Sequence, residues 1–253
     1  MFKTRLILSK SIFPFQALFF STVLWSHDAD TLQTIEKVHE HGNFQLHVHT
    51  LWESRYVSEG RDALEGKSIS TGSFEIGYDH LSLGVWYGRS SNHEYEERQF
   101  SMAISEETDE YEFYLAYGNN FFLREKESED EWSLGIGYKD LPFGMNTVLD
   151  SYYSIDAKGV FLEWMGGKEF NPNEGVVLYL SGTLGWNENY VRDGHDGLNF
   201  FAFRNGFSKI LSQNFLLFGH GTYNWAINRN KNLAGDLALK NIPHLGFGLK
   251  WDF

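Results

Sequence analysis

The sequence predicts an all-β protein: a closed, antiparallel, up-and-down transmembrane β-barrel of about ten strands, within a range of roughly eight to twelve, after a cleaved signal peptide. Three observations lead to this fold class. Apolar and polar residues alternate with a period of two, many apolar faces end in Tyr or Trp, and short connections alternate with long polar ones. A mean hydropathy of −0.37 excludes a multi-helix membrane protein, which would need repeated apolar runs of about 20 residues.

The composition narrows the function classes. The 253 residues include 34 acidic and 21 basic side chains and carry a formal net charge of −13. This balance argues against a partner that is a nucleic acid, because proteins that bind nucleic acids present a basic face. The absence of Cys removes disulfide scaffolds, thiolate zinc sites and Cys nucleophiles.

Residues 1–26 have the layout of a secretory signal peptide. Lys3, Arg5 and Lys10 form a basic head, an uncharged apolar stretch follows, and Ser26 is a small residue at the expected cut. The alternative is a membrane anchor, but Pro14 interrupts the apolar run and the run is short for a span. The mature chain then divides into a polar segment, 27–42, and a barrel, 43–253.

Ten segments alternate as strands with one apolar and one polar face. In the first, Phe44 and Leu46 lie on one side, His47 and His49 lie on the other, and Leu51 falls on the polar side against the pattern. The ten segments are 44–52, 74–78, 81–87, 111–117, 132–138, 160–164, 176–186, 201–207, 215–225 and 245–253.

A soluble sandwich also alternates, so further features decide for a barrel in lipid. The polar faces carry charged residues and Gly, which suits a crowded or wet lumen. Amphipathic rings near strand ends predict aromatic girdles at the two membrane interfaces. The predicted girdle residues are Trp52, Tyr78, Tyr87, Tyr117, Tyr138, Trp186, Trp225 and Trp251.

The connections alternate in length, as in outer-membrane barrels. Residues 79–80 and 211–214 are short, whereas 90–108, 141–156 and 187–194 are long and polar. Residues 119–131 break the alternation, which indicates either an insertion or an extra strand near Phe121 and Phe122. The sheet must close, because an unpaired strand edge in hydrocarbon leaves backbone groups without hydrogen-bond partners.

The last strand, LGFGLKWDF, alternates aromatic residues and ends at Phe253. It resembles the assembly signal of Gram-negative outer-membrane barrels. The resemblance implies recognition by the barrel-assembly machinery through this strand, a location in the cell outer membrane, and contact with outer-membrane lipid and lipopolysaccharide.

A second resemblance covers roughly residues 44–140. The stretches ESRYVSEGRDAL, FEIGYDHLSLGVWYGRSS and EYEFYLAYGNNFF resemble the opening of the TorF-type porins. The matching residues are Ser54, Tyr56, Val57, Gly60, Gly84, Trp86, Glu110 and Tyr114. This resemblance implies a barrel more directly than it implies transport.

The polar faces place a set of charged side chains in the lumen, where they line the predicted pore. They are Glu53, Arg55, Glu75, Glu112, Lys139, Glu163, Arg204, His244 and Lys250. Two arrangements remain open: the charges pair and plug the barrel, or they line a narrow water path. If water passes, the acidic excess favours small cations.

Other residue clusters have simpler explanations. His39, His41, His47 and His49 hint at a metal, but strand alternation alone produces the same polar face, so no metal and no cofactor are predicted. The acidic residues Glu94, Glu96, Glu97, Glu106, Glu107, Asp109 and Glu110 read as solvated loops, with divalent ions at the lipopolysaccharide surface as the alternative.

The sequence does not predict an enzyme. Ser91 with His93, and His195 with Asp196, are fragments that lack a nucleophile, a base and an orienting group together. The predicted function is a narrow passive porin for small solutes or ions with a mild cation preference. The first alternative is a closed structural or surface-interaction barrel with acidic outer loops, and a weaker one is a lipid or peptide hydrolase with a site at the rim.

Overall fold

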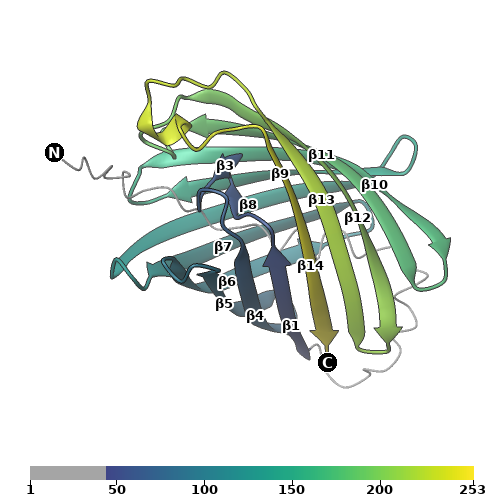
Figure 1. Cartoon of the computed structure of the whole chain (residues 1–253). Helices are drawn as coiled ribbons and strands as arrows, with labels where there is room; N and C mark the ends of the chain where they lie inside the picture. Colours follow the sequence, from purple (N-terminus) through teal and green to yellow (C-terminus); the bar gives the residue numbers. More distant parts are fainter. Residues whose placement is uncertain (1–43) are drawn as a thin grey trace.

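The computed structural model describes residues 44–253, so the predicted signal peptide and polar segment lie outside the described residues. The described chain forms a closed antiparallel barrel in which each strand pairs with the next along the chain (Figure 1). The first strand closes the barrel by pairing with the last. No helix among residues 44–253 is long and apolar enough to cross a membrane. The predicted all-β fold class is confirmed.

Twelve strands form the wall. They are β1 (Phe44–Glu53), β4 (Ile69–Tyr78), β5 (Leu81–Ser90), β6 (Glu96–Glu107), β7 (Tyr111–Phe122), β8 (Glu127–Leu141), β9 (Met145–Ser154), β10 (Gly159–Asn173), β11 (Val176–Glu188), β12 (Gly197–Ser212), β13 (Phe215–Ala226) and β14 (Ile242–Asp252). Two short strands, β2 (Val57–Ser58) and β3 (Arg61–Asp62), form a two-stranded sheet outside the barrel wall, and η1 (Ala234–Asp236) is one turn of 3-10 helix.

The count of about ten was too low by two strands, although it lay within the predicted range. Residues 90–108 and 141–156 were predicted as long connections, yet they contain β6 and β9. With β6 and β9 included, the connection within residues 119–131 falls at the end of the barrel where longer connections are expected. β7 and β8 extend into this range, and only residues 123–126 join them. Neither an insertion nor a further strand lies near Phe121 and Phe122, since both belong to β7.

The connections differ in length at the two ends of the barrel. Short connections (79–80, 108–110, 142–144, 174–175 and 213–214) lie at the end that also holds Phe44 and Phe253, called here the turn end (Figure 1). The opposite end, called the loop end, carries residues 54–68, 91–95, 123–126, 155–158, 189–196 and 227–241. An even number of strands returns both ends of the described chain to the turn end.

The outer face of the barrel is apolar. Leu134 is 47% exposed and Leu249 is 37% exposed, and their neighbours along each strand, such as Gly135 and Gly248, are buried. An apolar surface that encircles the molecule is costly in water but matches the hydrocarbon of a bilayer. The apolar face of each strand therefore points outward, and the polar face points into the lumen.

The aromatic residues that the sequence assigned to girdles lie at two levels of the outer face. Trp52, Tyr87, Tyr117, Trp186 and Trp225 lie toward the loop ends of their strands, and Tyr78, Tyr138 and Trp251 lie toward the turn ends. Rings pack in pairs across neighbouring strands: Tyr117 lies 5.3 Å from Trp132, and Tyr111 lies 5.0 Å from Tyr138, between ring centroids. Their contact with the lipid interface stays a prediction.

Candidate functional site

The lumen has two halves that differ in burial. On β7 the inward side chains Tyr114 and Asn120 are buried, whereas Glu112, near the turn end, is only half-buried. On β8 the inward Glu131 is buried, and Lys139, near the turn end, is half-buried. Water therefore reaches the inward face at the turn end, while the loop-end half is packed.

Aromatic side chains fill the loop-end half. One cluster consists of Tyr56, Ile69, Trp86, Tyr95 and Phe122. Another consists of Tyr152, Phe161, Tyr190, Val191, Phe200, Ala202 and Leu239. The interior of an eight-stranded barrel is just filled by its own side chains, so a twelve-stranded one has room for additional chain.

Residues 54–68, the connection between β1 and β4, supply that additional chain and are called here the plug segment. β2 and β3 form its hairpin, and Glu59 and Gly60 at the turn have positive φ angles of 40° and 71°. Gly60 lies against Phe200 of the wall, where an added Cβ would be 2.6 Å from the ring. The plug segment therefore folds inward and docks on the lumen wall.

Arg61 anchors the plug segment. Its side chain is fully buried and donates to Gly235 O (2.9 Å), Asn199 Oδ1 (2.6 Å) and Asp236 Oδ1 (3.2 Å). Backbone pairing of Asp62 N with Ala238 O (2.9 Å) adds to the link. The connection between β13 and β14 thus contacts the plug segment at the loop end and holds it in place.

Burial shifts the acid–base behaviour of this anchor. Burial lowers the pKa of Arg61, although Glu59 and Asp236 oppose the shift. Burial alone raises the pKa of Asp236, but hydrogen bonds from Asn230 and His195 outweigh it and the net pKa is lowered. Burial raises the pKa of Glu59 well above its usual value, against the nearby Arg61 charge. Glu59 is thus a carboxyl group whose charge is disfavoured in the docked plug segment.

The predicted lumen residues differ in burial and in the part of the chain to which they belong. Glu53 and His244 are buried in the wall, and Glu75, Glu112, Lys139, Glu163, Arg204 and Lys250 are half-buried on inward faces. Arg55 lies in the plug segment instead of the wall and pairs with Asp62 at 3.2 Å.

Several of these charges have partners across the strands. Lys139 pairs with Glu107 and lies 3.9 Å from Glu112. Lys250 lies 3.3 Å from Asp252, and Arg204 donates to Thr222 Oγ1 at 3.0 Å. The pairs are local, between neighbouring strands or along one strand.

Among the inward carboxylates that were not predicted as lumen residues, three are fully packed: Glu97, Glu131 and Asp150. They lie on β6, β8 and β9 and are buried. Tyrosine hydroxyls satisfy them: Tyr95 donates to Glu97, Tyr190 donates to Glu131, and Tyr114 donates to Asp150 at 2.8 Å. Two of the three lie on strands that had been read as loops, so their facing could not be assigned.

Carboxylates outnumber cations on the inward faces of the described strands. The acidic side chains include Glu53, Glu75, Glu97, Glu107, Glu112, Glu131, Asp150, Glu163, Glu169 and Asp252, against the basic Lys139, Arg204 and Lys250. The inward faces therefore carry more acidic than basic side chains.

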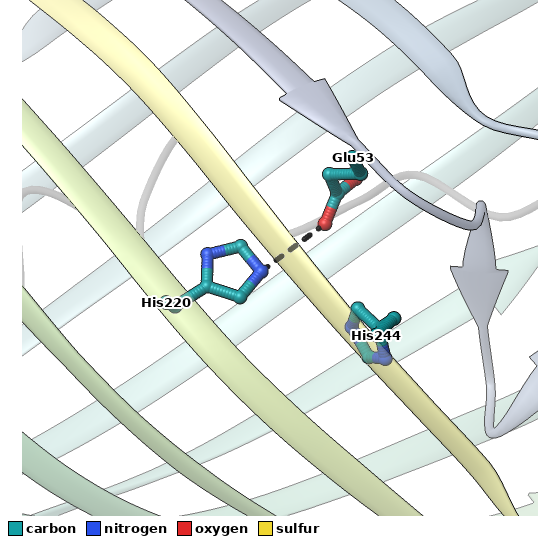
Figure 2. Close-up of side chains that lie close together, drawn as sticks. All are labelled: Glu53, His220 and His244. Carbon is teal, nitrogen blue, oxygen red and sulfur yellow. Dashed lines mark ion pairs between the residues drawn. The ribbon is translucent and has the colours of Figure 1, made fainter.

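One cluster brings together residues with metal-ligand chemistry. Figure 2 shows Glu53 and His220 facing each other from β1 and β13, with His244 nearby on β14. His220 Nε2 lies 3.4 Å from Glu53 Oε1, and one potential ligand atom from each residue lies within 4.8 Å of the others. The sequence had placed Glu53 and His244 in the lumen but did not single out His220.

The histidines suspected from their spacing do not form such a cluster within residues 44–253. His47 Nδ1 lies 2.5 Å from Asp252 Oδ1, and the His49 ring stacks on Phe218 at 4.8 Å. His39 and His41 lie outside the described residues.

The predicted acidic loops are in part a strand. Glu96, Glu97, Glu106 and Glu107 belong to β6, so their assignment to solvated loops is wrong. Glu96 accepts a hydrogen bond from Tyr87 (2.5 Å) on the outer face.

The residues of the two suspected catalytic fragments make structural contacts in different parts of the loop end. His195 Nδ1 lies 2.6 Å from Asp236 Oδ2, which places it beside the Arg61 anchor. His93 Nδ1 lies 3.0 Å from an Arg89 nitrogen, and Ser91 lies beside the chain turn at Asn92. In neither place do the contacts among described residues join a nucleophile, a base and an orienting group.

Comparison with known proteins identifies relatives by fold. No protein-family model matches the sequence, and no curated protein matches it. Among solved structures, the KdgM porin is similar, with a TM-score of 0.56, 7% identity, and coverage of 82% of this chain and 99% of that one. The NanC porin has a TM-score of 0.53 at 9% identity and covers 81% of this chain and 98% of its own. At these identities the likeness concerns the fold: this chain has the closed barrel found in porins.

Proposed function

We propose that this protein is a narrow passive channel of the bacterial outer membrane that favours small cations. The observation that carries the proposal is the excess of inward carboxylates in the half of the lumen that water reaches. Glu75, Glu112 and Glu169 are half-buried there, on β4, β7 and β10. A ring of carboxylates raises the local concentration of cations and lowers that of anions.

The charge of the lumen distinguishes this proposal from transport of acidic sugars. A further similar structure is the KdgM porin in complex with disordered oligogalacturonate, with a TM-score of 0.52 and 6% identity over 83% of this chain and 99% of that one. Oligogalacturonate is a polyanion. The acidic inward face of the present chain repels such a ligand, so we propose cations or neutral small solutes as its cargo.

The packed loop end favours a second candidate, a closed structural barrel. The plug segment and the two aromatic clusters occupy the loop-end half of the lumen, where the inward side chains are buried. The channel proposal therefore includes displacement of the plug segment during conduction. The channel proposal expects the barrel to conduct ions once the plug segment is displaced. A closed structural barrel would not conduct ions even without its plug segment.

The outer-membrane location, the lipid and lipopolysaccharide contacts, and membership of the TorF-type porins are part of the proposal. The apolar outer belt and the porin-like barrel support the location. Phe253 supports a role for the last strand in assembly: its ring lies 4.8 Å from Trp251, and its N–H donates to Leu46 O at 3.0 Å, next to the closing seam. We propose that the barrel-assembly machinery recognises this strand.

The test is the reversal potential across a planar lipid bilayer under a KCl gradient. The triple variant E75Q/E112Q/E169Q is compared with E94Q/E125Q/E188Q, which removes the same charge from exposed residues outside the lumen and outside the plug segment. The proposal expects a shift toward zero cation preference in the inward variant and little change in the exposed variant. Equal reversal potentials in the two variants would remove the inward carboxylates from the ion path.

A further inference from the structure

We propose that Glu53, His220 and His244 bind a divalent transition-metal ion, with Zn²⁺ as the natural probe, at the seam where the barrel closes. The proposal does not depend on whether the barrel conducts ions. Two imidazoles and one carboxylate are a donor set that zinc and other first-row metals accept, with a remaining position for water.

Strand register brings the three side chains together. Gly246 of β14 is paired with Glu53 of β1 on one side and with His220 of β13 on the other. His244 lies two residues along β14, so its side chain points to the same face, about 7 Å along the strand. The cluster therefore spans the first strand and the last two, as Figure 2 shows.

Gly246 leaves the space in which the ligands meet. An added Cβ would lie 2.5 Å from His220 Cε1 and 3.2 Å from Glu53 Cγ. The absence of a side chain at Gly246 allows the imidazole and the carboxylate to approach each other across β14.

The burial of the three side chains and the unpaired nitrogen of His244 are a second observation that points to a ligand. Glu53 is 5% exposed, and His220 and His244 are each 7% exposed. His244 Nδ1 is buried and has no hydrogen-bond partner among the described residues, and the buried His220 Nε2 has only the Glu53 carboxylate, at 3.4 Å. Buried polar atoms in folded proteins nearly always have partners, and a metal ion would serve both nitrogens at once.

The distances and charges define the kind of ion. Ligand atoms around a tetrahedral zinc lie about 3.3 Å apart, given metal–ligand bonds of about 2.0–2.1 Å. The present atoms lie within 4.8 Å of one another, so small side-chain rotations complete the site. Arg204 acts electrostatically on all three residues and disfavours loosely held cations. Imidazole donors compensate for this repulsion with metals such as zinc but not with Mg²⁺ or Ca²⁺.

A bound ion would link β1 to β13 and β14 across the seam. Because the ligands come from both ends of the described chain, the ion would stabilise the closed barrel over forms in which β1 has separated from β14. The expected effect is a rise in the temperature at which the barrel unfolds, since a ligand that binds only the folded state stabilises it.

The experiment uses the mature barrel without an affinity tag, refolded in detergent and stripped with a chelator. Zn²⁺ binding is measured by equilibrium dialysis with elemental analysis, and the unfolding temperature is read from the gel-mobility shift of the barrel. The H220Q and H244Q variants are compared with the matched control H49Q, which changes another inward histidine of the same wall. The visible spectrum of bound Co²⁺ reports the coordination geometry.

The proposal expects one more tightly bound zinc in the wild type and in H49Q than in H220Q or H244Q, and a zinc-dependent rise in unfolding temperature in the first two alone. Equal zinc content in wild type and both site variants, or an equal loss in H49Q, overturns it. Should the site variants fail to fold, a Co²⁺ spectrum of the wild-type protein decides: four-coordinate bands with nitrogen ligands support the site, and an octahedral aqueous spectrum refutes it.

Discussion

Gly60 lies where the plug segment comes closest to the barrel wall. Its φ angle is +71°, and an added Cβ would be 2.6 Å from the Phe200 ring. Two effects therefore oppose any other residue at this position: the backbone strain of a positive φ and a steric clash with an aromatic side chain. Gly66, also in the plug segment, has the first effect without the second, since its φ is +85° and nothing lies within 4 Å of its added Cβ.

We predict that G60A loosens the plug segment more than G66A. The clash adds about 1–3 kcal/mol to the strain that both variants share. Hydrogen exchange of the plug-segment amides measures the free energy of undocking in each variant. Equal exchange rates in G60A and G66A would show that the plug segment does not press on Phe200.

Glu59 makes docking of the plug segment depend on pH. Burial raises the pKa of Glu59 well above 4.5, so the docked state holds a proton that the undocked state releases. Its contribution to docking is complete below the undocked pKa and is lost as the pH rises through the docked pKa. Arg61, which faces Glu59, opposes this shift, and the inward Glu131 and Glu163 reinforce it.

The plug segment is therefore expected to undock more readily as the pH rises above 4.5, the usual pKa of a glutamate, and E59Q is expected to abolish part of that dependence. A spin label or fluorophore at exposed Lys67 reports the mobility of the segment in both proteins. Comparison with E59Q removes the contributions of other groups, such as Tyr56. The same pH profile in E59Q and wild type would contradict the role of Glu59.

At the level of strands, alternation identifies a segment only where lipid demands an apolar face. β6 begins with Glu96 and Arg98 on its outer face, toward the loop end, so its pattern fades and the sequence reads as a loop. β9 mixes Thr147 and Ser151 with Leu149 on its outer face, with the same result. Strands with a continuous apolar face, such as β7, could be predicted from the sequence because an apolar residue stands at each outward position.

The plug segment could not be predicted, because its polar sequence is typical of an exposed connection. Its burial depends on tertiary partners far along the chain: Arg61 bonds to Asn199, 138 positions away, and to Asp236, 175 positions away. The metal-ligand cluster has the same difficulty. Period two places His220 and His244 on inward faces, but only the register of β13, β14 and β1 shows that they meet Glu53.

Replacement of residues 56–66 by a short Gly/Ser linker is expected to leave the wall intact and raise the single-channel conductance. The hairpin β2–β3 pairs with itself and is not one of the twelve wall strands, so its removal costs no wall pairing. Heat-modifiable mobility on a gel checks that the barrel remains folded.

The matched control replaces the exposed loop residues 91–94, which lie outside the plug segment at the same end of the barrel. This control is expected to keep the wild-type conductance. Unchanged conductance after removal of the hairpin would show that the plug segment does not control the path.

At the scale of the whole molecule, the barrel separates two environments. The outer face offers apolar side chains to a bilayer, the turn-end half of the lumen offers carboxylates to water, and the loop-end half is packed by aromatic side chains and the plug segment. Part of the net charge of −13 thus comes from carboxylates on the inward faces.

The most direct test of this account is the reversal potential of the barrel with residues 56–66 replaced, recorded under a KCl gradient, because the plug segment then no longer limits the current. The account predicts open channels with a reversal potential on the cation-selective side. A silent barrel, or one that prefers chloride, would contradict the claim that the acidic inward face lines an ion path.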